Sequence, residues 1–245
     1  MRQAPGRAKV FPVLLLLGPT DVGKTTLALW LLERAKEAHL LDLDPGQGSL
    51  PGTFTLFRYR EGTLTPVRRA LVGALSPVGV EAKALVAALR LARLIPRGSP
   101  AIGDTDGLLD PSYRLLQVDA LAPAEVLVLG SEALYRALSW RQDLRVRLAK
   151  PLPEARRKTA AERRRNRLER LLLHFREARP RALPLEVPGE AGRLYGLLDA
   201  EGFFLAYGKL LAWEGGEGLF LTPHAGEVAR LEATRLSLPT PALPG

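Results

Sequence analysis

The 245-residue sequence contains no cysteine, one methionine and three histidines, and aromatic residues make up 6% of it. The absence of cysteine excludes disulfide bonds and thiolate metal sites. The histidines are widely spaced, which argues against a zinc cluster. No apolar stretch approaches the roughly 20 residues that a membrane-spanning helix needs. These absences predict a globular, cytoplasmic protein that does not contact a membrane.

Strand and helix patterns alternate through the first 150 residues. The near-continuous apolar run 10–17 predicts a strand covered on both faces. Further strands are predicted at 39–44, 68–75, 100–107, 125–130 and 144–149. Helices are predicted at 25–38, 81–94, 112–121 and 131–138, and Trp30, Trp140 and Trp213 are expected in the core. This alternation predicts an α/β fold, a parallel sheet with helices on both faces.

Residues 18–25, GPTDVGKT, fit the pattern G-x-x-x-x-G-K-[ST] between a predicted strand and a predicted helix. Glycines allow backbone N–H groups to turn inward around an anion, and the helix start adds its positive dipole end. The motif predicts a P-loop that holds a nucleoside triphosphate, with Lys24 at the β- and γ-phosphates and the Thr25 hydroxyl on Mg²⁺. The predicted nucleotide-binding residues are Gly18, Pro19, Thr20, Asp21, Val22, Gly23, Lys24, Thr25 and Thr26.

Two motifs of other P-loop proteins are missing. The chain has no N/T-K-x-D guanine motif and no Asp-Glu pair. In their place stands Asp42-Leu-Asp44-Pro-Gly-Gln47, whose two acids share one face of a strand. One acid is suited to hold Mg²⁺ through water, and the other to accept a proton from an attacking hydroxyl. The pattern favours phosphoryl transfer to an alcohol.

Basic residues concentrate in one segment. The net charge is +9, and residues 141–181 contain thirteen Arg and two Lys against five acids, so the rest of the chain is almost neutral. Such a segment suggests a polyanionic partner, although a solvated Arg-rich helix has the same composition. Arg163, Arg167 and Arg170 would share one face of a helix predicted at 153–178. Arginines that close over a transferring phosphoryl group neutralise its charge.

The segments GPTDVGKTTL, LDLDPGQGSLPGT, GALSP, DTDG and RRRNRLERLLLHF occur in the order found in polynucleotide 5′-hydroxyl kinases. The chain resembles this family, which includes the kinase subunit of the mRNA 3′-end cleavage factor, the ribosomal-RNA-processing kinases and their archaeal relatives, over roughly residues 10–180. The resemblance implies transfer of the γ-phosphate of ATP or GTP to the 5′-OH end of RNA or DNA, with Mg²⁺ as cofactor.

The resemblance also implies roles for individual residues. Asp44 matches the general base, and Asp42 the accessory acid that would join Thr25 at the metal. Arg163 and Arg167 match the Arg-x-x-x-Arg lid. The implied substrate-binding residues are Gln47, Thr105, Gly107, Leu108 and, as a weaker candidate, Arg170. Leu108 departs from the T-x-G-W substrate clasp, in which a tryptophan would stack on a base.

The C-terminal texture differs from the rest, because short strand-like runs alternate with glycine-containing turns. We therefore expect a P-loop kinase domain at 1–180, including the lid helix, and a small β-rich domain at 181–245. Two other functions stay open. One is a small-molecule P-loop kinase, and the other is a nucleotide-binding scaffold in an RNA-processing assembly.

Overall fold

The computed structural model describes residues 13–238, which form two compact units. The described part of the first unit contains residues 13–43, 56–67 and 88–157. The second contains residues 44–55, 68–87 and 158–238. Asp44 therefore follows directly on the last residue of the first unit's second strand. The predicted boundary after residue 180 stays a prediction.

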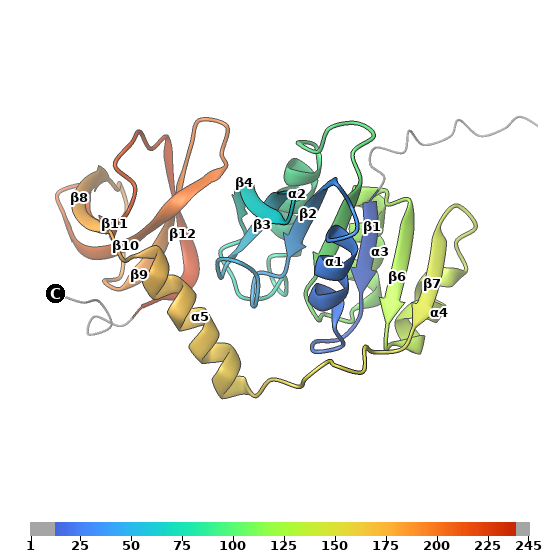
Figure 1. Ribbon diagram of the computed structural model, residues 1–245. Coiled ribbons are helices and arrows are strands. Elements are labelled where there is room, and N and C mark those ends of the chain that lie inside the picture. The colour runs from blue at the N-terminus through green and yellow to red at the C-terminus, as the bar shows by residue number, and fades with distance from the viewer. Residues whose placement is uncertain (1–12, 239–245) are drawn as a thin grey trace, which may run out of the picture. The chain divides into compact units, whose positions relative to one another are not determined.

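The first unit is built on a parallel sheet. Its strands are β1 (Val13–Leu17), β2 (Glu37–Leu43), β5 (Ala101–Thr105), β6 (Glu125–Leu129) and β7 (Arg145–Ala149). They lie in the order β2-β5-β1-β6-β7, with every neighbouring pair parallel (Figure 1). The central strand β1 reads VLLLL because neighbours on both sides and packing above and below bury it. The loops that leave the carboxyl ends of β1 and β5 consequently open at the same edge.

The first unit's helices are α1 (Lys24–Leu32), α3 (Pro111–Leu121) and α4 (Glu132–Ser139), while α2 (Glu81–Ala92) crosses the unit boundary. Two of them, α3 and α4, begin at side-chain caps, whereas α1 begins directly after Gly23 of the phosphate loop. The Asp110 carboxylate accepts from the N–H groups that open α3, and the Ser131 hydroxyl does so for α4. The hydrophobic core joins α1 to the sheet through Leu16, Ala28, Leu32, Leu40 and Ile102.

A hairpin connects the two units along the chain. Strand β3 (Thr53–Arg60) and strand β4 (Thr63–Leu71) are joined at Glu61 and Gly62, whose φ angles are 49° and 81°. Two positive φ angles in succession are typical of the tight turn that matches the twist of a hairpin.

The second unit contains a helix and an antiparallel sheet. The helix is α5 (Ala160–His174), and the strands are β8 (Arg179–Pro184), β9 (Arg193–Leu198), β10 (Phe204–Glu214), β11 (Glu217–Thr222) and β12 (Arg230–Ser237). The strand order is β12-β9-β10-β11-β8. A cap starts α5: the Thr159 hydroxyl accepts from the Glu162 N–H, and the Glu162 carboxylate accepts from the Thr159 N–H. Leu171 and Phe175 pack with Tyr207 in the core beneath it.

The mixed α/β fold, the parallel core sheet and the antiparallel C-terminal strands are confirmed. Several element bounds differ from the prediction. Helix α1 ends at Leu32 instead of residue 38, because β2 begins at Glu37 and pairs with β5 from His39 onward. Helix α5 begins at Ala160 instead of residue 153, because the Thr159 hydroxyl accepts the Glu162 N–H and caps the helix there. No helix between residues 13 and 238 is long and apolar enough to cross a bilayer.

Two further expectations were wrong. No strand was expected at β3, and of the strand expected at 68–75 only residues 68–71 are in a strand, where they form the end of the longer β4. Trp30 and Trp140, expected in the core, are 47% and 69% exposed. The Cζ atom of Arg34 lies 3.4 Å from the centroid of the Trp30 ring, so a guanidinium group, and not apolar side chains, covers this indole. Residues 10–12 of the first predicted strand lie outside the described residues.

Candidate nucleotide and phosphoryl-transfer site

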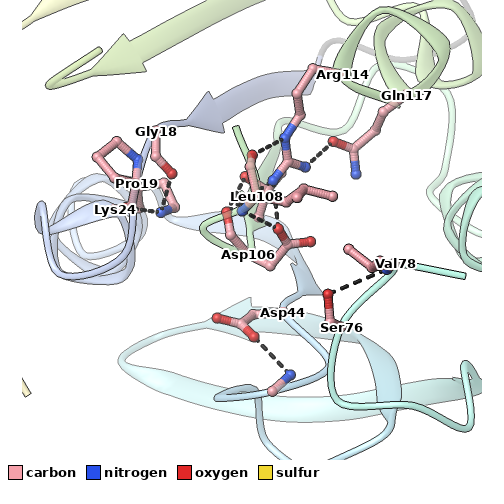
Figure 2. Close-up of polar contacts among 12 residues, drawn as sticks. Gly18, Pro19, Lys24, Asp44, Ser76, Val78, Asp106, Leu108, Arg114 and Gln117 are labelled. Carbon is pink, nitrogen blue, oxygen red and sulfur yellow. Dashed lines mark hydrogen bonds and ion pairs between the residues drawn. The ribbon is translucent and has the colours of Figure 1, made fainter. Parts of the chain in front are cut away.

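The phosphate loop links β1 to α1 with the geometry that its motif predicts. Gly18 has a φ of 142°, and a Cβ atom there would lie 2.2 Å from the carbonyl oxygen of Leu129, so only glycine fits. Helix α1 begins immediately after the loop, so its first N–H groups and positive dipole end face the loop. The Lys24 Nζ donates to the carbonyls of Gly18 at 2.8 Å and Pro19 at 2.7 Å (Figure 2). The lysine thus lies within the loop, where a phosphate would meet it.

The second residue of α1 contacts an acid that the sequence analysis did not select. The Thr25 hydroxyl donates to Oδ2 of Asp104 at 2.6 Å. Asp104 lies on β5, the strand beside β1, and is 5% exposed. The sequence carried a signal for it, because Asp104 opens the DTDG segment at the end of a predicted strand. The resemblance to the T-x-G-W clasp assigns roles to Thr105, Gly107 and Leu108 in this part of the chain and none to Asp104.

Asp42 lies next to Asp104 in the sheet. The two residues are register partners on the parallel strands β2 and β5, and Asp42 is 9% exposed. Two carboxylates and a hydroxyl gathered at one strand edge are hard oxygen ligands of the kind that Mg²⁺ prefers. A divalent cation would also offset the repulsion between the two acids. The donor set therefore fits the metal predicted at Thr25 and Asp42, with Asp104 added.

The predicted clasp follows β5. The Thr105 hydroxyl donates to the carbonyl of Leu16 at 2.8 Å, which ties the clasp to the strand before the phosphate loop. Leu108 is half-buried, and its N–H donates to Oδ1 of Asp106 at 2.6 Å. Tyr113, the nearest aromatic residue along the chain, is 3% exposed. A side chain so deeply buried offers no face for stacking, so Tyr113 does not replace the missing tryptophan.

In the second unit, the turn after β2 holds the carboxylate of Asp44. Oδ1 of Asp44 accepts from the N–H groups of Gly46 and Gln47, both at 2.8 Å. The Gln47 side chain donates to the carbonyl of Gly46 at 2.8 Å. These bonds fix the orientation of the carboxylate.

The basic helix presents two faces. Arg163, Arg167 and Arg170 are half-buried, whereas Arg164, Arg165 and Arg176 are exposed. Nη1 of Arg170 donates to the carbonyls of Gln47 and Gly48. Arg170 therefore ties α5 to the turn that carries Asp44, a structural contact beside the substrate-binding role predicted for it.

The earlier part of the basic segment is largely neutralised by acids. Arg141 bonds to Asp119 at 2.7 Å and Asp143 at 2.6 Å, and Arg147 bonds to Glu125 at 2.7 Å. The Asp143 hydrogen bond, partly offset by burial, raises the pKa of the Arg141 guanidinium above its ordinary value. Arg145 also pairs with Glu125, at 3.5 Å. Acids within the first unit therefore engage Arg141, Arg145 and Arg147.

The predicted site residues fall into two groups, one in each unit. The first unit brings together Lys24, Thr25, Asp42, Asp104, Thr105, Gly107 and Leu108. The second contains Asp44, Gln47, Arg163, Arg167 and Arg170. Besides Asp104, the sequence analysis missed Arg114, a fully buried arginine that bonds to the clasp.

Comparison with known proteins gives a family and a fold. A search of curated proteins finds no match. A solved structure of a Clp1p–Pcf11p complex matches with a TM-score of 0.72 and 13% identity, covering 92% of this chain and 74% of the other. A second, titled for the extended interface between Pcf11p and Clp1p and for ATP loss in a point mutant, matches with a TM-score of 0.68 and 13% identity, covering 92% and 75%. These two likenesses concern the fold.

The family model of the mRNA cleavage and polyadenylation factor CLP1 P-loop matches residues 18–177. The match starts at the first glycine of the phosphate loop and ends just beyond α5. It therefore spans both the nucleotide loop and the basic helix, and the chain belongs to the CLP1 P-loop family.

Proposed function

We propose that this protein is a polynucleotide 5′-hydroxyl kinase, which transfers the γ-phosphate of ATP or GTP to the 5′-OH end of RNA or DNA. The observation that carries the proposal is the coexistence of a formed phosphate loop and an oriented carboxylate at Asp44 in one chain of this family. Nucleotide binding alone requires the loop. Transfer to an alcohol also requires a group to take the proton of that alcohol.

The first unit supplies the phosphate-binding groups. The amides around Gly18–Lys24 and the ammonium of Lys24 bind the β- and γ-phosphates, and Lys24 leaves its two loop carbonyls for them. Thr25, Asp104 and Asp42 would hold Mg²⁺. When bound, Mg²⁺ would supply positive charge that offsets the charge developing on the phosphates.

Asp44 and the arginines of α5 would supply the groups for transfer. The carboxylate of Asp44 accepts the proton of the 5′-hydroxyl, and the oxygen of that hydroxyl attacks the γ-phosphorus. The bond from that phosphorus to the bridging oxygen breaks, and the nucleoside diphosphate leaves. Arg163 and Arg167 neutralise the equatorial oxygens of the phosphoryl group in transit. The products are a 5′-phosphorylated strand and a nucleoside diphosphate.

The acceptor is inferred from charge and from the clasp. The exposed arginines of α5 suit a chain of phosphates more than a single small metabolite. Gly107 and Leu108 would contact the 5′-terminal nucleotide, with Leu108 giving apolar contact in place of stacking. Thr105 would serve substrate binding by holding the clasp, since its buried hydroxyl is bonded to the Leu16 carbonyl.

A direct assay tests the proposal. Labelled ATP and GTP are each offered with matched 5′-OH RNA and DNA oligonucleotides, and with nucleosides and nucleotides as competing acceptors. Label on the 5′ end of oligonucleotides alone is the expected result. Label on nucleosides or nucleotides would identify a small-molecule kinase.

The second candidate function is a nucleotide-binding scaffold in an RNA-processing assembly. Leu108 favours it, because leucine lacks the aromatic ring on which a base of the acceptor would stack. A scaffold would bind nucleotide, as shown by equilibrium dialysis, and transfer nothing to any acceptor. That combination of results would replace the kinase assignment.

A further inference from the structure

A buried arginine lies beneath the clasp. Arg114, on α3, is fully buried, and its guanidinium bonds to Asp106 and Leu108 of the clasp (Figure 2). Its Nη2 donates to Oδ1 of Asp106 at 2.6 Å and to the carbonyl of Asp106 at 3.0 Å. Its Nε donates to the carbonyl of Leu108 at 2.9 Å, and its Nη1 to Oε1 of Gln117 at 2.6 Å. All five nitrogen-bound protons of a guanidinium point in fixed directions, so this set of bonds fixes the shape of the clasp.

The acid that receives Arg114 also shapes the clasp from within. Oδ1 of Asp106 accepts the Leu108 N–H at 2.6 Å as well as the guanidinium. The buried ion pair therefore closes a small ring of bonds around residues 106–108. A buried pair of this kind is a weak source of stability, and holding a local conformation is its better-attested use.

The same segment presses on the phosphate loop. A Cβ atom at Gly107 would lie 2.3 Å from Cγ2 and 2.6 Å from the backbone N of Thr20. The backbone of Gly107 therefore packs directly on the loop, and no larger residue fits between them. Any movement of residues 106–108 would change the space beside Thr20.

From these contacts we propose that Arg114 is a positioning residue, which holds the clasp against the phosphate loop so that the acceptor's 5′ end meets the donor phosphate. The inference rests on the proposed kinase function for its acceptor. It does not make Arg114 a catalytic residue, because the guanidinium is fully buried and its hydrogen bonds go to the clasp and to Gln117.

We expect substitution of Arg114 to change the KM for the oligonucleotide acceptor more than the affinity for the nucleotide donor. The phosphate loop has its own restraints, namely Gly18 and the Lys24 bonds, whereas the conformation of residues 106–108 is held by the bonds of Arg114. We expect Arg114→Met to raise KM for a 5′-OH oligonucleotide by about 10-fold or more, because small misplacements of a binding group reduce productive encounters. The affinity for a fluorescent ATP analogue should change less than about 3-fold.

Arg114→Lys keeps the charge and lacks the planar fork, so it should fall between the wild type and Arg114→Met. Arg136→Met and Arg136→Lys are the matched controls, since Arg136 forms an exposed ion pair with Glu132 on α4. Both should match the wild type. If Arg114→Met does not fold, Arg114→Lys and Asp106→Asn supply the same comparison.

Hydrogen exchange separates positioning from overall stability. We expect peptides that cover residues 105–108 to exchange faster in the Arg114 variants, with the β6 and β7 peptides unchanged. Wild-type KM and wild-type exchange in a folded Arg114→Lys variant would overturn the inference while transfer by the wild type still stands. If the wild type transfers no phosphate, the kinase function fails instead, and the exchange of residues 105–108 alone decides whether Arg114 holds the clasp.

Discussion

At the residue scale, the pair formed by Thr25 and Asp104 places a carboxylate where the phosphate loop would meet a cation. We predict that Asp104→Asn raises the Mg²⁺ concentration needed for half-maximal transfer by about 10-fold or more, because the site loses one of its anionic ligands. Initial rates over a Mg²⁺ titration measure this. Glu33→Gln, at the exposed end of α1, is the control. An unchanged Mg²⁺ requirement in Asp104→Asn would remove this residue from the metal site.

Asp44 differs from Asp104 because its role lies in proton transfer. Asp44→Asn should lower kcat by about 10²- to 10⁴-fold, the usual contribution of a general base, and leave the affinity for nucleotide unchanged. Asparagine still accepts the Gly46 and Gln47 N–H bonds, so the turn should persist. Single-turnover transfer rates make the measurement, with the exposed Glu214→Gln as control. Full activity in Asp44→Asn would eliminate the proposed base.

At the scale of elements, α5 carries the arginines of the proposed lid. Arg163→Ala should reduce kcat by about 100-fold with little change in either KM, since lid groups act on charge that develops in the transition state. Steady-state kinetics with both substrates varied separate the two parameters. Arg164→Ala, one residue away on the exposed face, provides the comparison. A change confined to KM for the oligonucleotide would make Arg163 a docking residue.

The element bounds show where sequence patterns fail to place the ends of helices and strands. The residues after Leu32 are good helix formers, and yet the chain turns there, because the next strand must reach its partner β5. β3 reads TFTLFRYR, an alternating and aromatic pattern that indicates a strand, and a prediction centred on βα units passed over it. For α5, Thr159 with Glu162 forms a recognisable capping box that would have placed its start correctly.

On the scale of the whole molecule, stability should depend on pH through His174. Burial, followed by the charge of Arg69, lowers the pKa of His174 from 6.5 to about 4. Its Nε2 accepts the N–H of Tyr207 at 3.0 Å, a bond that protonation would remove. Between these two pKa values the unfolded chain binds more protons than the folded chain, so stability is full above pH 6.5 and falls as pH drops toward 4. The loss should reach about 3 kcal/mol.

Urea unfolding at several pH values from 4 to 7.5 measures that loss. The matched variant is His174→Gln, which keeps a hydrogen-bond acceptor and does not titrate. Its stability should vary less with pH, and the contribution of His39, whose pKa burial also lowers, is common to both proteins. Identical pH slopes for the two proteins would contradict the role of His174.

The concentration of charge on α5 leads to a prediction about docking. Binding of a single-stranded oligonucleotide should weaken by about 10- to 100-fold between 50 and 200 mM salt, as expected for about three to five phosphate contacts. Replacing Arg164 and Arg165 together by Gln should make this dependence shallower, whereas Arg93→Gln with Arg97→Gln should not. Fluorescence anisotropy provides the affinities, and a salt-insensitive affinity would count against α5 as the docking surface.

The sequence by itself determined those features that depend on residues close together along the chain. The phosphate loop lies within eight consecutive residues, and its strand and helix flank it. The spacing of Asp42 and Asp44 predicted one shared strand face, but β2 ends at Leu43 and Asp44 lies in the turn that follows. Only the tertiary structure decided that Asp104 contacts Thr25 across 79 residues and that Arg114 holds the clasp. The physical reason is that parallel strands become neighbours through connections of many residues, and the pairing register, which no local pattern encodes, selects which side chains meet.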